Sequence, residues 1–367
     1  MGNTTPVRTV VILPPLNVWR HLAAASRDLK DFTQYEYGLL CLKPVYGLND
    51  APLAWQLSLH SFLLELGTHR SKLDENCFYW KQPNSEKIDV FNNLDAMVTT
   101  HVDDLAIMAE ESWLDLHYNK FVQKFQKVTR QQLPFQHCGC EYAETNQGFS
   151  ITQKDFAEKL THAKVPSRAE ESKLLPEEVT EFRSVLGALL WVTSTRLDVV
   201  SDISLLQSRV TVAEVRDIKV ANSVVDKVKA YSDVGLHYRF FESDHQRVVC
   251  VHDASSASKG RHYAQEGILV MLADDHWRGH QIDHEHICDD YTVAKHGGVM
   301  HVLHSHGAKA KRVSYSTSHS ETLAMVNGIE STTLVSTRLS EIMHHEPAPT
   351  LDQLVVFARK RKPQFAS

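Results

Sequence analysis

The chain has 367 residues, of which 43% are hydrophobic and 23% are charged, as is usual for globular proteins. This length predicts two or three domains, and no apolar run approaches the roughly 18 residues that a membrane-spanning helix needs. The formal net charge of −6 argues against a large basic surface of the kind that binds nucleic acid.

Six cysteines are scattered along the chain without a repeated Cys-x-x-Cys pair. This spacing favours neither a disulfide framework nor a zinc finger, and it fits a reducing compartment. No secretory signal is visible at the N-terminus. We therefore expect an intracellular protein, cytoplasmic or nuclear, without a membrane partner.

Hydrophobic periodicity predicts several elements in the first half of the chain. In chain order they are a helix over 53–66, a strand over 77–80, two strands over 96–102 and 105–109, and a helix over 112–127. Gly67 is placed to cap the first helix. The strands expected over 96–102 and 105–109 are separated only by Asp103 and Asp104. A polar turn this short predicts a hairpin.

The second half is predicted to begin with a linker at 164–179, which holds Pro166, Pro176 and mixed charge. The elements expected after it are helices over 181–192 and 212–232, a strand over 247–251 that ends at His252-Asp253, and a helix over 321–343. Residues 274–310 are rich in His, Asp and Gly and lack periodicity, so they are predicted to form a long loop.

Two segments of the first half carry possible chemistry. Residues 43–55 form a turn that opens a helix, because Gly47 punctuates the chain and Pro52 is tolerated in a first turn. Adjacent carboxylates such as Asp103 and Asp104 are common turn formers. On a tight turn they can also point into one cleft, where carboxylate oxygens are suitable ligands for Mg²⁺ and substrate phosphates.

Together these segments resemble the reverse transcriptase of copia-type retrotransposons. That family has a Tyr-Gly-Leu-x-x-Ala-Pro-x-x-Trp block, matched here by Tyr46, Gly47, Leu48, Ala51, Pro52 and Trp55. A Val-Asp-Asp hairpin follows in the family, and Val102, Asp103 and Asp104 match it, with His101 in place of the usual Tyr. Further similar stretches are residues 139–153, 182–191 and Thr195-Arg196-Leu197-Asp198, where Leu197 replaces a proline.

Residues 247–324 are similar to the RNase H that follows reverse transcriptase in these polyproteins. Asp253 stands where the family has its first catalytic Asp, and Glu321 stands where the family has a metal-binding Glu. Asp253 could equally just end a strand, and Ser318-x-x-Glu321 also fits a helix capping box.

The resemblance implies an α+β fold and three regions. These are a fingers and palm remnant at 1–163, a linker with a helical thumb-like region at 164–245, and a C-terminally truncated RNase H-like domain at 246–367. It implies that Asp103, Asp104, Asp253 and Glu321 are catalytic Mg²⁺ ligands. Tyr46, Gly47, Ala51, Pro52 and Trp55 would contact the substrate. The implied partners are an RNA or DNA template-primer and an RNA–DNA hybrid.

The chain departs from the family pattern in both catalytic sets. Residues 1–27 contain no Asp or Glu, so the third polymerase carboxylate is missing. Asp352 is the last carboxylate of the chain, and its surroundings do not match the third RNase H Asp. Two metal ions that normally bind three carboxylates cannot be bound in the same way by two carboxylates. We therefore expect a catalytically incomplete chain. The alternatives are an enzyme completed by flanking sequence and a non-enzymatic nucleic-acid- or protein-binding protein with this fold.

Two clusters of soft ligands compete with this interpretation. One comprises His284, His286, Cys288, Asp289, Asp290, His301, His304 and His306. These are zinc-type ligands, but a solvated loop is the simpler interpretation of 274–310. The other is His137-Cys138-Gly139-Cys140, which lies inside the family match.

Overall fold

The computed structural model describes residues 9–26, 28, 37–42, 45, 47–49, 51–81, 94–241, 246–255, 263–274, 299–314, 316–343 and 364–366. The fold is mixed α+β with several small, mainly antiparallel sheets. Two compact units are formed, Met1–Arg130 with Ile342–Ala348, and Gln131–Glu341 with Pro349–Ser367. The division after Arg130 falls within the expected region 1–163, not at its end. Within the described ranges no helix is long and apolar enough to cross a membrane.

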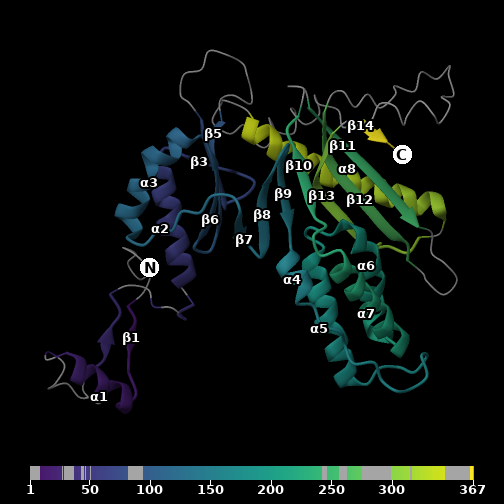
Figure 1. Cartoon of the computed structure of the whole chain (residues 1–367), viewed down its shortest axis with the longest axis horizontal. Coiled ribbons are helices and arrows are strands. Elements are labelled where there is room, and N and C mark those ends of the chain that lie inside the picture. Colours follow the sequence, from purple (N-terminus) through teal and green to yellow (C-terminus); the bar gives the residue numbers. More distant parts are fainter. Residues whose placement is uncertain are drawn as a thin grey trace. The chain divides into compact units, whose positions relative to one another are not determined.

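The first unit contains a two-stranded antiparallel sheet with one helix, then a four-stranded sheet with two helices (Figure 1). Its elements are β1 (Val11–Ile12), α1 (Leu16–Ala25), β2 (Leu39–Leu40), α2 (Ala51–Glu65), β3 (His69–Arg70), β4 (Cys77–Lys81), β5 (Leu94–His101), β6 (Asp104–Ala109) and α3 (Glu111–Phe125). The sheet has the order β3-β4-β5-β6, and every neighbouring pair is antiparallel. The helix, strand and hairpin predictions for this part are confirmed.

α2 and α3 pack on one face of this sheet. The core between them contains Leu63, Phe78 and Val98, none of which is exposed. Phe62 of α2 makes edge-to-face contacts with two rings of α3. Burial of these aromatic and aliphatic side chains is the main force that holds the helices to the strands. Gly67 follows α2 with a φ of 90°, as expected for a residue that ends a helix.

The second unit contains two four-stranded sheets and the remaining helices. Its elements are β7 (Phe135–His137), β8 (Cys140–Thr145), β9 (Gly148–Thr152), α4 (Lys154–Glu158), α5 (Pro176–Val192), the 3-10 turns η2 (Leu197–Val199) and η3 (Val210–Val212), α6 (Val200–Arg209), α7 (Val215–Ala230), β10 (Leu236–Arg239), β11 (Gln246–Ser255), β12 (Gln265–Asp274), β13 (Met300–Lys309), α8 (Thr317–Met343) and β14 (Gln364–Ala366). The sheet orders are β10-β9-β8-β7 and β13-β12-β11-β14.

α4 to α7 enclose a core of their own, in which Phe182, Leu189, Ile218 and Val225 are fully buried. The predicted linker 164–179 ends earlier than expected, because Pro176 begins α5. The Glu178 carboxylate accepts a 2.7 Å hydrogen bond from the Leu175 N–H, and this contact caps the helix. The predicted helix 212–232 begins later, at Val215, because η3 precedes it.

The prediction of a loop over 274–310 is wrong for its last part. Residues 300–309 form β13, which pairs with β12 along its whole length. Residues 275–298, which include His284, His286, Cys288, Asp289 and Asp290, lie outside the described residues.

Helices lie against both faces of the sheet β13-β12-β11. A Cβ atom on Gly307 of β13 would lie 2.5 Å from a methyl group of Val200 in α6. On the other face, a Cβ atom on Gly328 of α8 would lie 3.1 Å from the Cys250 sulfur of β11. α8 runs across this second face (Figure 1).

Candidate functional site

The segment before α2 is a short series of turns. The N–H of Leu48 donates to the Val45 carbonyl, and the N–H of Ala51 donates to the Leu48 carbonyl. Gly47 has a φ of 95°, which an L side chain rarely adopts. Ala51 is buried, and Pro52 stands in the first turn of α2, as predicted. Tyr46 lies outside the described residues.

Trp55 joins α2 to the β5–β6 hairpin. Its indole N–H donates a 2.7 Å hydrogen bond to the Val102 carbonyl, and its ring lies 5.3 Å from that of Phe125. The two motifs, 47 residues apart in sequence, are therefore in contact. The prediction that Asp103 and Asp104 lie at a hairpin turn is confirmed, and the hydrogen bond from Trp55 places this turn beside α2.

The hairpin turn itself has an unusual backbone. His101 and Asp104 are paired, so Val102 and Asp103 make a two-residue turn. Val102 has a φ of 57°, a conformation that costs a β-branched residue energy and that favours glycine. The Trp55 hydrogen bond to this residue's carbonyl helps to hold the conformation.

Asp103 and Asp104 are both exposed. Leu105 and Ile107 point towards α2 and α3, so strand alternation places Asp104 on the opposite face of the sheet. Over the described part of the chain, no group of three or more His, Cys, Asp or Glu side chains is arranged to hold a metal ion. Two adjacent carboxylates without a third do not fit a two-Mg²⁺ centre, which needs to offset the charge of several phosphate oxygens.

Asp253 lies on β11, and Glu321 lies on α8, the helix that packs on one face of the same sheet. Asp253 pairs with Gly267, and Gly267 pairs with Gly307, so Asp253 is on the face that α6 covers. Its neighbour His252 is on the other face, beside Gly328 of α8. Glu321 belongs to the first turns of α8. That Asp253 and Glu321 together hold Mg²⁺ stays a prediction.

The interpretation of Ser318-x-x-Glu321 as a helix capping box is wrong, because the cap lies two residues earlier in the sequence. Ser316 precedes α8, and its hydroxyl accepts a 3.1 Å hydrogen bond from the His319 N–H. Ser316 is thus the residue that caps the helix.

Glu266, which sequence reasoning missed, is a carboxylate on the α8 face of the sheet. Glu266 is 6% exposed and pairs with Ala254 of β11. Asn327 of α8 donates a 2.6 Å hydrogen bond to it. A side-chain amide satisfies this buried acid, so the contact fastens α8 to β12. An acidic residue within an otherwise apolar strand was the sequence signal that could have indicated Glu266.

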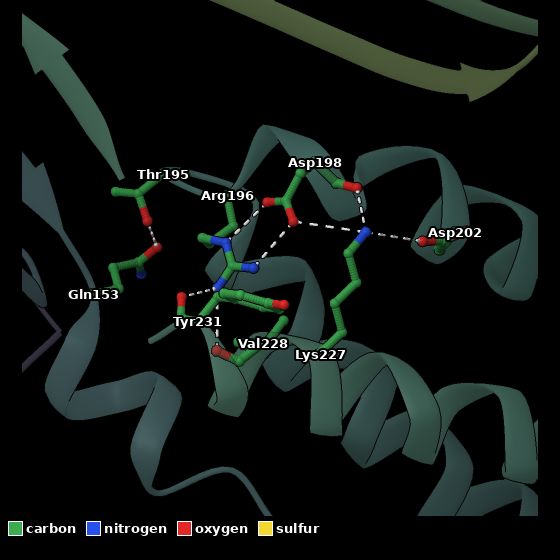
Figure 2. Close-up of polar contacts among 8 residues, drawn as sticks. All are labelled: Gln153, Thr195, Arg196, Asp198, Asp202, Lys227, Val228 and Tyr231. Atoms are coloured by element: carbon green, nitrogen blue, oxygen red, sulfur yellow. Dashed lines mark hydrogen bonds and ion pairs between the residues drawn. The ribbon is translucent and has the colours of Figure 1, made fainter. Parts of the chain in front are cut away.

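Arg196 is the centre of the best-defined polar cluster of the second unit (Figure 2). Its guanidinium is 2% exposed and contacts both oxygens of Asp198 at 2.8 and 3.0 Å. It also donates to the carbonyls of Val228 and Tyr231 at the end of α7. Lys227 reaches Asp198 from the same helix.

This cluster is internally satisfied, which points to a structural role. Arg196 closes the last turn of α7, where backbone carbonyls lack helical partners. The preceding Thr195 donates a 3.0 Å hydrogen bond to Gln153, which in turn donates to the Trp191 carbonyl. The Thr-Arg-Leu-Asp segment therefore ties α5, α6 and α7 together.

Of the two soft-ligand clusters, the structure describes His137, Cys138, Gly139 and Cys140 of one and His301, His304 and His306 of the other. His137 and Cys140 are paired residues of the β7–β8 hairpin, and burial raises the pKa of the Cys140 thiol. A raised pKa disfavours the thiolate that binds metals. His301 is buried, and its Nε2 accepts a 2.9 Å hydrogen bond from the Arg239 N–H.

Comparison with known proteins gives one informative relative. The chain is 27% identical over 172 residues to the retrovirus-related Pol polyprotein from transposon RE2 of Arabidopsis thaliana. The match covers 42% of this chain and 11% of that polyprotein, so it spans about a tenth of the relative's length. No family model matches the chain. No solved structure matches it. The similarity supports an origin from a retrotransposon Pol polyprotein.

Proposed function

We propose that this chain derives from the reverse transcriptase and RNase H region of a copia-type Pol polyprotein and has kept the scaffold without a complete metal centre. The observation that carries the proposal is the Val102-Asp103-Asp104 turn held against Trp55 at the start of α2. Two motifs that are distant in sequence meet there, as the resemblance requires.

The incomplete centre determines the expected activity. Asp103 and Asp104 are adjacent and exposed, and the described residues offer no third ligand beside them. A primer hydroxyl and a leaving pyrophosphate would lack the second metal clamp that phosphoryl transfer needs. Among the described residues, Asp253 and Glu321 likewise belong to no group of three or more possible metal ligands.

Primer extension on an RNA template, with Mg²⁺ or Mn²⁺, tests the polymerase part of the proposal. We expect no template-dependent product from the purified chain. The matched control is Asp103→Asn, which removes one charge from an exposed turn and should not affect folding. Extension by the wild-type chain that disappears in this variant would contradict the proposal. Cleavage of an RNA–DNA hybrid that depends on Asp253 would contradict its RNase H part.

A binding protein that uses the same scaffold is the second candidate, favoured because each unit has a well-packed core of its own while the metal centre is incomplete. Fluorescence anisotropy with a labelled RNA–DNA hybrid over a salt series tests whether such a protein binds nucleic acid or a protein ligand. Binding that weakens with salt indicates phosphate contacts. Because the net charge is −6, we expect the chain to bind the hybrid weakly. Weak binding of the hybrid would favour a protein ligand.

A further inference from the structure

β13 is an edge strand that carries three histidines, and two of them are exposed. The sheet order β13-β12-β11-β14 places β13 at one edge of its sheet, and β10 contacts its first residues, where the Tyr238 hydroxyl donates to the Val302 carbonyl. His301 is buried and engaged by the Arg239 N–H. His304 and His306 are exposed.

His304 and His306 lie on the same face of β13. A bulge interrupts the ladder at Leu303, since Val302 and His304 pair with consecutive residues of β12. After the bulge the register is regular: His304 pairs with Val270 and His306 with Ile268. Residues two apart on a regular strand share a face and have Cα atoms about 6.7 Å apart.

α6 packs against β13 on the opposite face of the sheet, where Gly307 meets Val200, and the described contacts of α8 reach β11 and β12. Val270 and Ile268 belong to the core below α8, whose recorded contacts are with β11 and β12 through Gly328, Asn327 and Val335. The two imidazoles therefore stand at the open margin of the α8 face.

We propose that His304 and His306 form a two-imidazole site for a divalent late transition metal, Ni²⁺ or Cu²⁺. Imidazole nitrogens suit these ions, and affinity rises from Ni²⁺ to Cu²⁺ and falls again at Zn²⁺. Metal–nitrogen bonds of about 2.0 Å let one ion bridge two imidazoles that project from the same strand face. A structural zinc site normally takes four protein ligands, so this pair favours ions that accept water in the remaining positions.

Carbethoxylation of histidines by diethyl pyrocarbonate, read out peptide by peptide by mass spectrometry, tests the site in the full chain. Ni²⁺ alone is the probe. We expect Ni²⁺ to protect His304 and His306 together, at one midpoint, and to leave the exposed His69 reactive. The peptide-resolved signal separates this site from the other histidines of the chain.

His306→Gln should weaken the protection of His304 by at least about tenfold, because the chelating partner is lost. The matched control combines His304→Gln with Lys309→His, which keeps the number of imidazoles on β13. His306 and residue 309 lie on opposite faces, so this variant should also lose protection. Circular dichroism checks that both variants fold. Unchanged reactivity of wild-type His304 and His306 in Ni²⁺, or protection of His304 that survives His306→Gln, would overturn the proposal.

Discussion

Arg196 shows how one buried cation can organise three helices. Four of its five N–H donors are used, two by Asp198 and two by the carbonyls at the end of α7. A guanidinium at 2% exposure is stable only when its charge is matched. The carboxylate of Asp198 is therefore essential to this junction, although its own side chain is 40% exposed.

Asp198→Asn is expected to lower the free energy of unfolding by about 2 kcal/mol, because Arg196 stays buried without its counter-charge. Urea unfolding followed by circular dichroism measures the change. The matched control is Glu170→Gln, which removes an acid from the exposed ion pair with Lys219. That control should change stability far less than Asp198→Asn, because solvent screens an exposed ion pair. Equal effects of the two variants would show that the burial of Arg196 does not matter.

The same junction should respond to acid in a defined direction. Hydrogen bonds from Arg196 lower the pKa of Asp198, while partial burial opposes the shift. A carboxyl group whose folded pKa is lowered stabilises the protein above its unfolded pKa, and this contribution is lost as the pH falls through the folded value. The stability difference between wild type and Asp198→Asn should therefore be constant near neutral pH and shrink below about pH 4. A difference that grows on acidification would contradict this assignment.

At the scale of elements, local patterns were predictive where the elements are close in sequence. α2, β4, the β5–β6 hairpin and α3 follow from periodicity and a two-residue polar turn. β13 does not, because His, Ser and Gly dominate its sequence and its strand conformation depends on the ladder with β12. Pairing across a long connection overrides weak strand propensity, and a single sequence does not display it.

The candidate site likewise has features that could be predicted from the sequence and features that could not. The meeting of Trp55 with the Asp103-Asp104 turn follows from the order of motifs. The face on which Asp253 lies depends on which helix packs on which side of the sheet, and the local sequence does not contain that information. The register of α8, where Ser316 rather than Ser318 caps the helix, was missed by two residues.

The β5–β6 turn makes a prediction about backbone strain. Val102 is 66% exposed, so its side chain contributes little packing, while its φ of 57° is unfavourable for a branched residue. Val102→Gly should stabilise the protein by about 0.5 kcal/mol, because it releases the backbone strain. The higher conformational entropy of the unfolded chain offsets part of this gain.

Val98→Gly on the same hairpin is the control. Val98 is fully buried, so its loss leaves a cavity and should cost about 3 kcal/mol. Thermal unfolding of both variants measures the contrast in sign. Destabilisation by Val102→Gly comparable to that of Val98→Gly would mean that the turn is not strained.

At the scale of the molecule, the two compact units have separate hydrophobic cores. The core of the first unit is drawn from α2, β4, β5, β6 and α3, and the main core of the second from α4 to α7 and their connections. The two cores share no residue. Because cooperative unfolding depends on a shared core, a single two-state transition is not expected for the whole chain.

Core truncations in each unit test this directly. Phe62→Ala removes a ring that contacts Phe121 and Phe125 at about 5 Å, and it should destabilise the first unit by about 3–5 kcal/mol. Leu189→Ala, at a fully buried position of α5, should destabilise the second unit by about 2–5 kcal/mol. Hydrogen exchange with peptide-resolved mass spectrometry along a urea series assigns each transition to its unit. Each variant should advance exchange in its own unit and leave the midpoint of the other unchanged. If Phe62→Ala and Leu189→Ala shifted both sets of peptides to the same extent, the two cores would unfold as one cooperative structure, and the division after Arg130 would have no thermodynamic meaning.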